Sequence, residues 1–218
     1  RSTLFPYTTL FRSQPLLEDG DVLTEVKAIE KNPEVVIATR KGIAIRFKES
    51  DVRAIGRAGM GVKGITLDKE DEVIGMEVMS PDDVFLSVSE NGYGKRTEVG
   101  KYRLQKRAGR GVINMQATER NGDIVGIKKA NKGEEIMVMT QNGITIRMRV
   151  DSISVIGRNT QGVRLVRLEE GDKVAAVACV VQEEAGGEVH DALEKAKPED
   201  KEDRKSTRLN SSHQPLSR

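Results

Sequence analysis

The sequence predicts an all-β protein, a propeller-like array of about three four-stranded blades. Three observations predict it: the 218-residue chain repeats about every fifty residues, apolar residues alternate with polar ones in short runs, and glycine-containing turns separate those runs. Four short strands per repeat make a small sheet with two broad faces. Because one such blade cannot cover both of its faces, successive blades are expected to stack.

A turn glycine and an arginine four residues later define the repeat. The glycines are Gly42, Gly92 and Gly143, and the arginines are Arg46, Arg96 and Arg147. Glycine-rich loops follow at 56–61, 106–111 and 157–162, each with a valine directly after it. Residues 21–23 also match residues 72–74. The chain is therefore expected to hold three whole repeats, preceded by the end of another.

Within the first repeat, residues 35–40 and 43–47 have the pattern of a β-hairpin around a Lys41-Gly42 turn. Apolar residues in the second run alternate with Ala44, Arg46 and Lys48, which is the period of a half-buried strand. Residues 144–149 alternate in the same way. Asn-Gly at the later two turns favours hairpins, because both residues tolerate positive φ. Two further strands are expected in each repeat, at 62–67 and 73–79 in the first.

The repeat spacing gives the expected domain boundaries. The end of a preceding blade occupies 15–34, and blades follow at 35–83, 84–134 and 135–184. The acidic segment 185–202 contains a stretch, 188–197, that favours a short helix, and is otherwise expected to be disordered. The end segments contain TLFPYTTLFRS and DRKSTRLNSSH, which look like in-frame translations of sequencing-library adaptors. Residues 1–14 and 203–218 are therefore treated as artefacts and left out of the fold prediction.

The composition argues against several classes of protein. The sequence contains no apolar stretch long enough for a transmembrane helix, so no membrane partner is expected. A single cysteine, Cys179, excludes an internal disulfide and a cysteine-based zinc cluster, and its apolar surroundings indicate a small buried residue. The histidines, His190 and His213, lie in polar segments. We expect no catalytic residue, metal or cofactor in this chain.

Other noticeable residues have structural interpretations. The glycine-rich loops resemble nucleotide-binding patterns, but they do not follow a strand and open a helix, which indicates turns. Tyr93 and Tyr102 lie at repeat positions that otherwise carry valine or isoleucine, so both are interpreted as core residues rather than nucleophiles. Methionines at strand positions are interpreted in the same way: Met76, Met79, Met115, Met137 and Met139.

Charge is sorted by half-repeat, although the net charge is only +2. The basic halves hold 17 Lys or Arg and 4 Asp or Glu, and they span 41–63, 91–111 and 142–164. The acidic halves hold 7 Lys or Arg and 18 Asp or Glu, and they span 64–90, 112–141 and 165–188. Since equivalent positions of stacked blades lie on equivalent surfaces, the basic halves predict a continuous positive band along one edge.

A positive band along a curved edge suits duplex DNA, whose helix carries about one negative charge per 1.7 Å of axis. Smooth bending of a 20–30 bp site costs roughly 1–6 kcal/mol, which several phosphate contacts can offset, and glycine lets backbone amides approach phosphates. With no recognition helix predicted, little sequence preference is expected. The predicted DNA-binding residues are the cations of the basic halves: Lys41, Arg46, Lys48, Arg53, Arg57, Lys63, Lys95, Arg96, Lys101, Arg103, Lys106, Arg107, Arg110, Arg147, Arg149, Arg158 and Arg164.

Four stretches closely resemble the family of C-terminal domains of the DNA gyrase A subunit, and they lie at 42–65, 89–99, 107–126 and 140–168. The resemblance runs from about residue 16 to residue 184. It implies a partial ring of a β-pinwheel, the last three blades of six, in which neighbouring blades exchange strands. It also implies a DNA-wrapping outer rim that supports negative supercoiling. The implied partners are duplex DNA, the gyrase B subunit, and the remainder of the gyrase A subunit, in the bacterial cytoplasm at the nucleoid; ATP and Mg²⁺ would be used by the parent enzyme.

The resemblance has limits. The family's Gln-Arg-Arg-Gly-Gly-Lys-Gly box belongs to the first blade, whereas the similar loop at 105–111 lies in the penultimate one, so we assign it no such role. With no catalytic-tyrosine region, the chain alone is not expected to cleave DNA. The alternatives are the C-terminal domain of the topoisomerase IV A subunit, or else a propeller-like protein-interaction module. Charge sorting argues against the second, and repeats without histidine argue against an enzyme.

Overall fold

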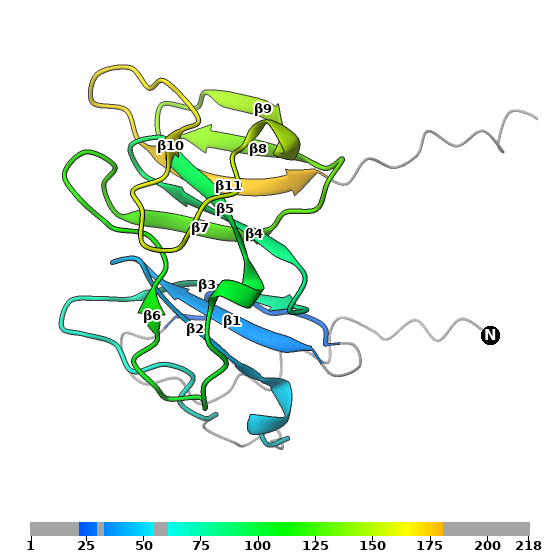
Figure 1. Cartoon of the computed structure of the whole chain (residues 1–218). Coiled ribbons are helices and arrows are strands. Elements are labelled where there is room, and N and C mark those ends of the chain that lie inside the picture. Colours follow the sequence, from blue (N-terminus) through cyan, green and yellow to red (C-terminus); the bar gives the residue numbers. More distant parts are fainter. Residues whose placement is uncertain (1–21, 30–32, 55–60, 181–218) are drawn as a thin grey trace, which may run out of the picture. The chain divides into compact units, whose positions relative to one another are not determined.

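The computed structural model describes residues 22–29, 33–54 and 61–180, in which eleven strands form three antiparallel sheets (Figure 1). Each sheet is built on one hairpin, which confirms the predicted all-β fold class. The hairpins are β1 (Glu34–Thr39) with β2 (Ile43–Lys48), β4 (Val84–Ser89) with β5 (Tyr93–Glu98), and β8 (Glu135–Thr140) with β9 (Thr145–Arg149).

On one side, each hairpin is joined by a later strand of the same repeat. These strands are β3 (Val73–Met79) beside β1, β7 (Ile124–Lys129) beside β4, and β11 (Val174–Val180) beside β8. They also pack against one another across the sheets, β3 with β7 and β7 with β11. We call this side of the three sheets the inner edge.

On the other side, a hairpin is completed by a short strand of the following repeat. β6 (Val112–Ile113) pairs with β2 of the first sheet, and β10 (Val163–Arg164) pairs with β5 of the second. The strand orders are therefore β3-β1-β2-β6 and β10-β5-β4-β7, while the third sheet, β11-β8-β9, has three strands among the described residues. We call the side formed by β6, β10 and the segments 102–111 and 153–162 that lead into them the outer edge.

The predicted strand at 62–67 is wrong. In this segment Ile65 makes only an isolated bridge, with Gly109 of the next repeat. The amide of Thr66 donates a 2.9 Å hydrogen bond to the carbonyl oxygen of Gly109. The neighbour of this segment is thus the glycine-rich loop of the next repeat, which turns away after one bridge and leaves no continuous ladder.

Glycine allows the exchanged strands to approach the hairpins. Gly111 and Gly162 directly precede β6 and β10, and their φ angles are 76° and 78°. A Cβ atom at Gly111 would lie 2.6 Å from the carbonyl oxygen of Ala44, and one at Gly162 would lie 2.8 Å from that of Gly94. Strand exchange therefore requires glycine at both positions, because the backbone there has a positive φ and leaves no room for a Cβ atom.

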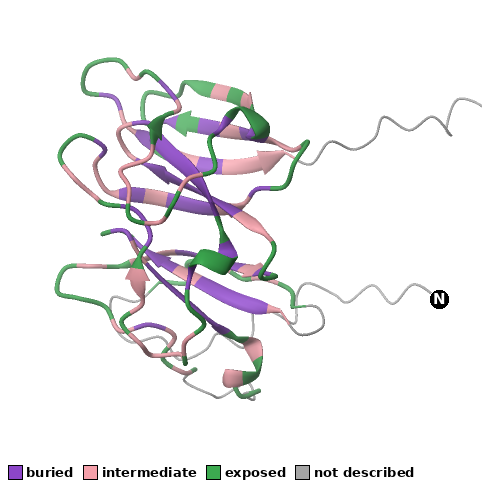
Figure 2. Ribbon diagram, in the orientation of Figure 1, coloured by how far each residue is buried: buried purple, intermediate pink, exposed green. Residues whose placement is uncertain are grey.

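Apolar side chains fill the spaces between neighbouring sheets. Figure 2 shows that many residues of the strands are buried. The first and second sheets share a core that includes Val36, Phe85 and Tyr102, with the two aromatic rings 4.9 Å apart. The second and third share one that includes Leu86 and Ile136. Full burial of such a side chain contributes about 1.5–3 kcal/mol, so contact between blades supplies much of the stability.

β2 is buried on both faces, whereas its alternating sequence predicted burial on one. All of residues 44–47 are buried, because the second sheet covers one face and another apolar cluster covers the other. Arg46 is enclosed together with Ile45. The predicted alternation is seen only in β9, where the exposed positions are Thr145, Arg147 and Arg149.

Three 3-10 helices follow the hairpins, and the sequence pattern did not predict them. They are η2 (Glu49–Asp51), η3 (Val99–Lys101) and η4 (Val150–Ser152), at equivalent positions of the three repeats. Val99 and Val150 are fully buried between the sheets. Each of η3 and η4 thus anchors the start of the segment that leads to an exchanged strand.

Arg46 fastens the first repeat to the second. Its Nε atom lies 2.5 Å from a carboxylate oxygen of Glu34, and its Nη1 atom donates to the carbonyl oxygens of Val99 (3.1 Å) and Tyr102 (2.8 Å). The residue is only 8% exposed. The prediction that Arg46 contacts DNA is wrong, since its guanidinium is buried and its partners hold the start of the exchanged segment.

Arg96 has the same role one repeat later, and its predicted DNA contact is wrong for the same reason. It is buried, and its Nε atom donates a 2.7 Å hydrogen bond to the carbonyl oxygen of Ile153. Arg147, the third member of the series, is exposed and pairs with Glu135. The three repeat arginines therefore form two classes, two interior and one on the surface.

Substitution should separate these two classes. We expect Arg46→Met to lower the free energy of unfolding by about 3–5 kcal/mol, because it leaves the buried Glu34 carboxylate without its partner. Arg147→Met, which breaks an exposed pair, should change it by about 0–1 kcal/mol. Urea denaturation followed by circular dichroism measures both. Equal losses in the two variants would contradict the assignment.

Candidate nucleic-acid interface

The basic connecting segments of the second and third repeats lie on the outer edge. The segment 102–111 leads from η3 to β6, and 153–162 leads from η4 to β10, so both run along the hairpin strands that they complete. In Figure 1 they cross in front of the hairpins. Strand exchange thus brings a basic half of one repeat beside a basic half of the preceding repeat.

The 17 predicted DNA-binding residues fall into four groups. Eleven are exposed: Lys41, Lys48, Arg53, Lys63, Lys101, Arg103, Lys106, Arg110, Arg147, Arg149 and Arg164. Arg107 and Arg158 are half-buried, and Arg57 lies outside the described residues. Arg46, Lys95 and Arg96 are buried, and for them the prediction of a DNA contact is wrong.

The two half-buried arginines tie neighbouring repeats together while staying near the surface. Arg107 donates to the carbonyl oxygens of Asp51 (3.0 Å) and Lys63 (3.1 Å) of the preceding repeat. Arg158 donates to the carbonyl oxygen of Ile113 at 2.9 Å. Their positive charges remain on the outer edge, because carbonyl oxygens accept hydrogen bonds without neutralising the guanidinium.

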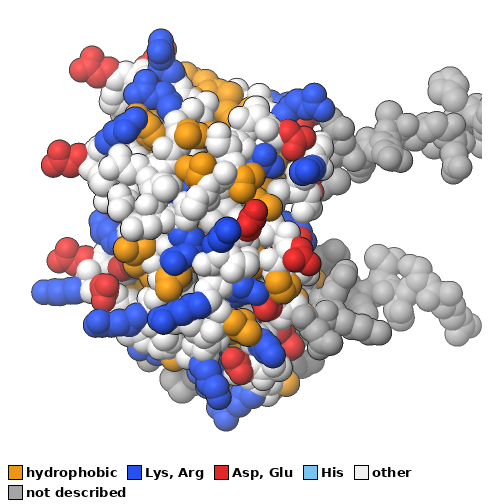
Figure 3. Space-filling view, viewed as in Figure 1, with side chains coloured by type: hydrophobic (Ala, Val, Ile, Leu, Met, Phe, Trp, Pro, Cys, Tyr) orange, Lys and Arg blue, Asp and Glu red, His pale blue; other side chains and the backbone are white. Residues whose placement is uncertain are grey.

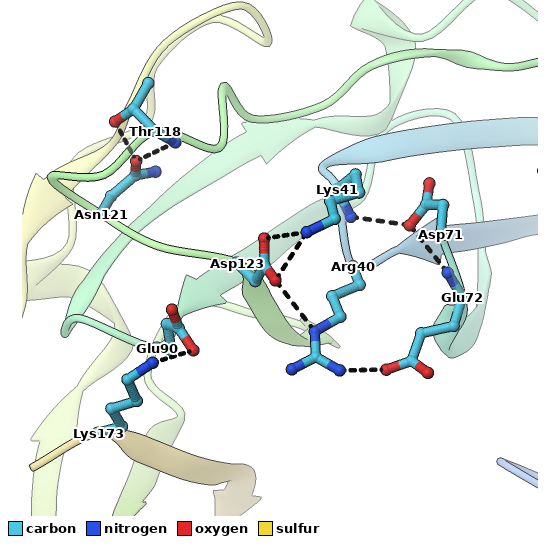
Figure 4. Close-up of polar contacts among 9 residues, drawn as sticks. All are labelled: Arg40, Lys41, Asp71, Glu72, Glu90, Thr118, Asn121, Asp123 and Lys173. Carbon is cyan, nitrogen blue, oxygen red and sulfur yellow. Dashed lines mark hydrogen bonds and ion pairs between the residues drawn. The ribbon is translucent and has the colours of Figure 1, made fainter. Parts of the chain in front are cut away.

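Carboxylates neutralise the cations near the hairpin turns. Lys41 lies 3.1 Å from Asp123, and Arg40 lies between Asp123 (3.1 Å) and Glu72 (2.6 Å). Figure 4 shows these contacts. Asp71 accepts a hydrogen bond from the Lys41 amide at 2.9 Å. These contacts join the first hairpin turn to the second repeat, so the turn end carries mixed charge rather than a continuation of the positive band.

Away from the turns, most of the surface cations have no acidic partner. Among the described residues, no carboxylate oxygen lies within 4.0 Å of the charged nitrogens of Lys48, Arg53, Lys63, Arg103, Lys106, Arg107, Arg149, Arg158 and Arg164. Figure 3 shows Lys and Arg side chains across the drawn face, with Asp and Glu mainly towards its left and right margins. The arrangement leaves positive charge available to an extended anionic partner.

Lys95 holds the connecting segment 153–162, and the residue that follows β6, from inside. Its side chain is fully buried, and Nζ donates to the carbonyl oxygens of Asn114 (2.6 Å), Gly157 (2.7 Å) and Arg158. Burial, and then the neighbouring positive charge of Arg158, lower the pKa of Lys95 to about 7. Ile45 occupies the equivalent position in the first repeat, and that apolar equivalence was the signal in the sequence for an interior lysine.

Both tyrosines are buried, which confirms their interpretation as core residues. The hydroxyl of Tyr102 donates a 2.7 Å hydrogen bond to Oδ1 of Asn114, and burial raises the pKa of Tyr102. The hydroxyl of Tyr93 accepts hydrogen bonds from Arg120 and Arg164, an arrangement that the sequence analysis missed because Arg120 belongs to an acidic half. Tyr93 therefore joins the core to a charged surface groove.

The remaining sequence-based interpretations hold in part. Met79 and Met115 are buried as expected, but Met139 is exposed. Cys179 is half-buried, and its pKa is raised by burial, as for a thiol in apolar surroundings. His190 and His213 lie outside the described residues. Among the residues that the structure covers, no helix is long and apolar enough to span a membrane, and no cluster of three or more His, Cys, Asp or Glu could hold a metal.

Comparison with known proteins assigns this architecture to a family. The family model described as "DNA gyrase C-terminal domain, beta-propeller" matches residues 33–79, 83–131 and 134–180. The chain belongs to the DNA gyrase C-terminal domain family. The exchanged strands β6 and β10 agree with the β-pinwheel that the resemblance implied.

The relatives are A subunits of DNA gyrase. That of Escherichia coli (strain K12) is 42% identical over 166 residues, which is 76% of this chain and 19% of the relative. That of Staphylococcus epidermidis (strain ATCC 12228 / FDA PCI 1200) is 44% identical over 169 residues, 77% of this chain and 19% of the relative. The chain thus spans about a fifth of the length of the curated relatives that it matches.

Solved structures show the same fold. A DNA gyrase A C-terminal domain matches with a TM-score of 0.72 and 26% identity, over 80% of this chain and 60% of that one. The C-terminal domain of a DNA topoisomerase IV matches with a TM-score of 0.66 and 26% identity, over 75% of this chain and 51% of that one. The two types of enzyme therefore share this blade architecture.

The buried lysine makes a pH dependence testable. Because the pKa of Lys95 falls from its ordinary 10.5 to about 7 on folding, the unfolded chain binds a proton between these values that the folded chain lacks. This group should therefore make the protein more stable as pH rises from about 7 towards 10, and should contribute no such gain below about 7. Urea denaturation of the wild type and of Lys95→Ile across this range measures the difference.

Other titrating groups are common to both proteins, so the difference between the two pH profiles isolates Lys95. Isoleucine is the matched replacement, because Ile45 and Ile146 fill the equivalent positions of the other two repeats. Parallel profiles would show that the three carbonyl acceptors keep the ammonium charged despite its burial.

Proposed function

We propose that this chain binds duplex DNA along its outer edge and bends it, as the DNA-wrapping C-terminal part of a gyrase A subunit. The observation that carries the proposal is the set of surface cations in the basic halves that, among the described residues, have no carboxylate oxygen within 4.0 Å. They come from all three repeats, with Arg53 and Lys63 in the first, Arg103 and Lys106 in the second, and Arg158 in the third.

The arrangement suits the DNA backbone rather than the bases. Cations presented from loops and short strands reach phosphates, and each phosphate that they neutralise releases condensed counterions. Among the described residues the only helices are three-residue 3-10 turns, which are too short to read the major groove. Binding is therefore expected to tolerate many sequences and to fall steeply with salt.

Bending follows from repetition. Successive repeats present equivalent cations on the outer edge, so a duplex that binds one repeat reaches further cations by following the edge to the next. Smooth bending costs roughly 1–6 kcal/mol for 20–30 bp, a cost that several phosphate contacts offset. The rigid ties between repeats, such as Arg46 to the carbonyl oxygens of Val99 and Tyr102, fix the spacing of these cations before DNA arrives.

The proposal extends to the assembly. The partners are the gyrase B subunit, together with the rest of the gyrase A subunit, and the wrapped DNA serves negative supercoiling by the assembled enzyme. ATP and Mg²⁺ act elsewhere in that enzyme, and the site of action is the bacterial nucleoid. The relatives, which are gyrase A subunits, support this placement, as does the matched gyrase A C-terminal domain.

Charge reversal tests the DNA contact. We expect Arg103→Glu with Lys106→Glu to weaken binding of duplex DNA and to reduce the magnitude of the slope of log K against log salt by about 0.9 for each phosphate that is no longer neutralised. The matched control is Lys69→Glu with Lys132→Glu, which makes the same charge change at exposed lysines of acidic halves. Fluorescence anisotropy with a labelled duplex at several salt concentrations measures both.

The control decides what weaker binding means. If the two double variants weaken binding equally, net charge rather than the outer edge governs it, and the proposal fails. A wild-type affinity that does not change with salt would also reject it. End-to-end energy transfer on a doubly labelled duplex reports bending directly, and an unchanged transfer on binding would exclude the wrapping role.

A further inference from the structure

A polar groove of about 300 Å³ lies beside the second hairpin turn, where residues of basic and acidic halves meet. Its lining includes Tyr93 of β5, Arg120 of the loop before β7, and Arg164 and Arg167 from β10 and the segment after it. Two stretches that are far apart in the sequence thus bring three guanidinium groups to one hollow beside Tyr93. The groove adjoins the outer edge through β10, whose residue Arg164 pairs with Tyr93.

Two of these arginines converge on one oxygen. Arg120 Nε and Arg164 Nη2 donate to the hydroxyl of Tyr93 at 3.3 and 2.9 Å, and their guanidinium carbons lie 5.1 and 5.4 Å from the ring centre. Tyr93 is only 4% exposed, so its position is fixed by the core beneath it. The hydrogen bonds from Arg120 and then from Arg164 lower the pKa of Tyr93.

A neutral phenol does not compensate two positive charges. Among the described residues, no carboxylate oxygen lies within 4.0 Å of the guanidinium nitrogens of Arg120, Arg164 or Arg167. Glu169 and Asp172 also line the groove. One carboxylate oxygen of Asp172, Oδ1, accepts hydrogen bonds from the amides of Asn142 and Lys173, while its Oδ2 is buried and has no hydrogen-bond partner among the described residues.

The guanidinium groups retain donors for another acceptor. Each carries five N–H groups, and the interactions described at the groove use one from Arg120 and one from Arg164. A phosphate group matches this arrangement, because guanidinium forks bind its oxygens in pairs and its charge balances theirs. The fixed phenol holds both forks in place before such a ligand arrives.

Blade packing does not require this cluster. At the junction of the first and second repeats, the positions equivalent to Tyr93, Arg120 and Arg164 are Ile43, Lys69 and Ile113. There Ile43 pairs with Ile113 in the same register as Tyr93 with Arg164, and none of the three positions carries an arginine. The cluster is therefore an addition to the common blade junction.

We propose that the groove of Tyr93, Arg120, Arg164 and Arg167 is a seat for one backbone phosphate of bound duplex DNA. This inference rests on the proposed function and extends it, since Arg120 and Arg167 lie in acidic halves. The bound duplex then extends from the outer edge towards the turn of the second hairpin. Of the two junctions described, only this one offers such a contact. Arg164 belongs to both surfaces and connects them.

Replacing Arg120 tests the seat, because Arg120 is exposed and has no other hydrogen bond among the described residues. We expect Arg120→Gln to reduce the magnitude of the salt slope of duplex binding by about 0.9, the equivalent of one phosphate contact. Arg120→Lys should restore most of it. Lys69→Gln, the same charge change at the equivalent position of the first repeat, should leave the slope unchanged.

The outcomes separate this inference from the proposed function. If Arg120→Gln keeps the wild-type slope while Arg103→Glu with Lys106→Glu lowers it, the seat is overturned and DNA binding along the outer edge stands. A wild type that does not bind duplex DNA overturns both. Equal decreases of the slope in Arg120→Gln and Lys69→Gln also overturn the seat, since they reflect net charge.

A second measurement distinguishes the source of the phosphate. The difference in ultraviolet tyrosine absorbance between the wild type and Tyr93→Phe follows the titration of Tyr93, whose pKa should rise when an anion shares its arginines. We expect duplex DNA to raise it and inorganic phosphate, at the same concentration of phosphate groups, to leave it unchanged. A shift with inorganic phosphate alone would overturn the assignment to DNA and identify a site for free phosphate. Circular dichroism confirms that each variant is folded.

Discussion

The structure depends on one constraint: the second strand of each hairpin needs a partner along its outer side, and the following repeat supplies it in both junctions described. β6 completes the first sheet and β10 the second, through glycines that let the backbones approach. Unpaired backbone groups of a buried strand are costly, so the exchange is obligatory for these sheets. The same exchange carries the basic connecting segments to the outer edge, so folding and the proposed DNA surface have one origin.

Basic residues serve two purposes in this fold, and burial separates them. Arg46, Lys95 and Arg96 donate to backbone carbonyl oxygens of the next repeat and hold the connecting segments in place. Arg103 and Lys106 lie on those segments and face solvent. The buried cations thus fix the positions of the segments that carry the exposed cations. A count of cations in the sequence does not distinguish the buried ones from the exposed ones.

The sequence was sufficient for the fold class, the repeat and the hairpins, because glycine turns and strand periodicity are local signals. The sequence was insufficient where a segment packs against a partner segment about fifty residues away in the chain. The alternation in β2 concealed burial on both faces, and residues 62–67 lack a ladder because a glycine-rich loop lies beside them. Sorting charge by half-repeat located the basic segments correctly, yet it assigned Lys95 to the surface and overlooked Arg120, whose neighbours are set by tertiary packing.

Exchange also makes the array directional and interlocked. The second repeat gives β6 to the sheet before it and receives β10 from the repeat after it, so its removal would leave the first hairpin without β6 and leave β10 without a sheet to join. Arrays whose units only touch at their faces can lose a unit at the cost of one interface. Here neighbouring units share sheets as well as faces, which favours cooperative unfolding of adjacent blades.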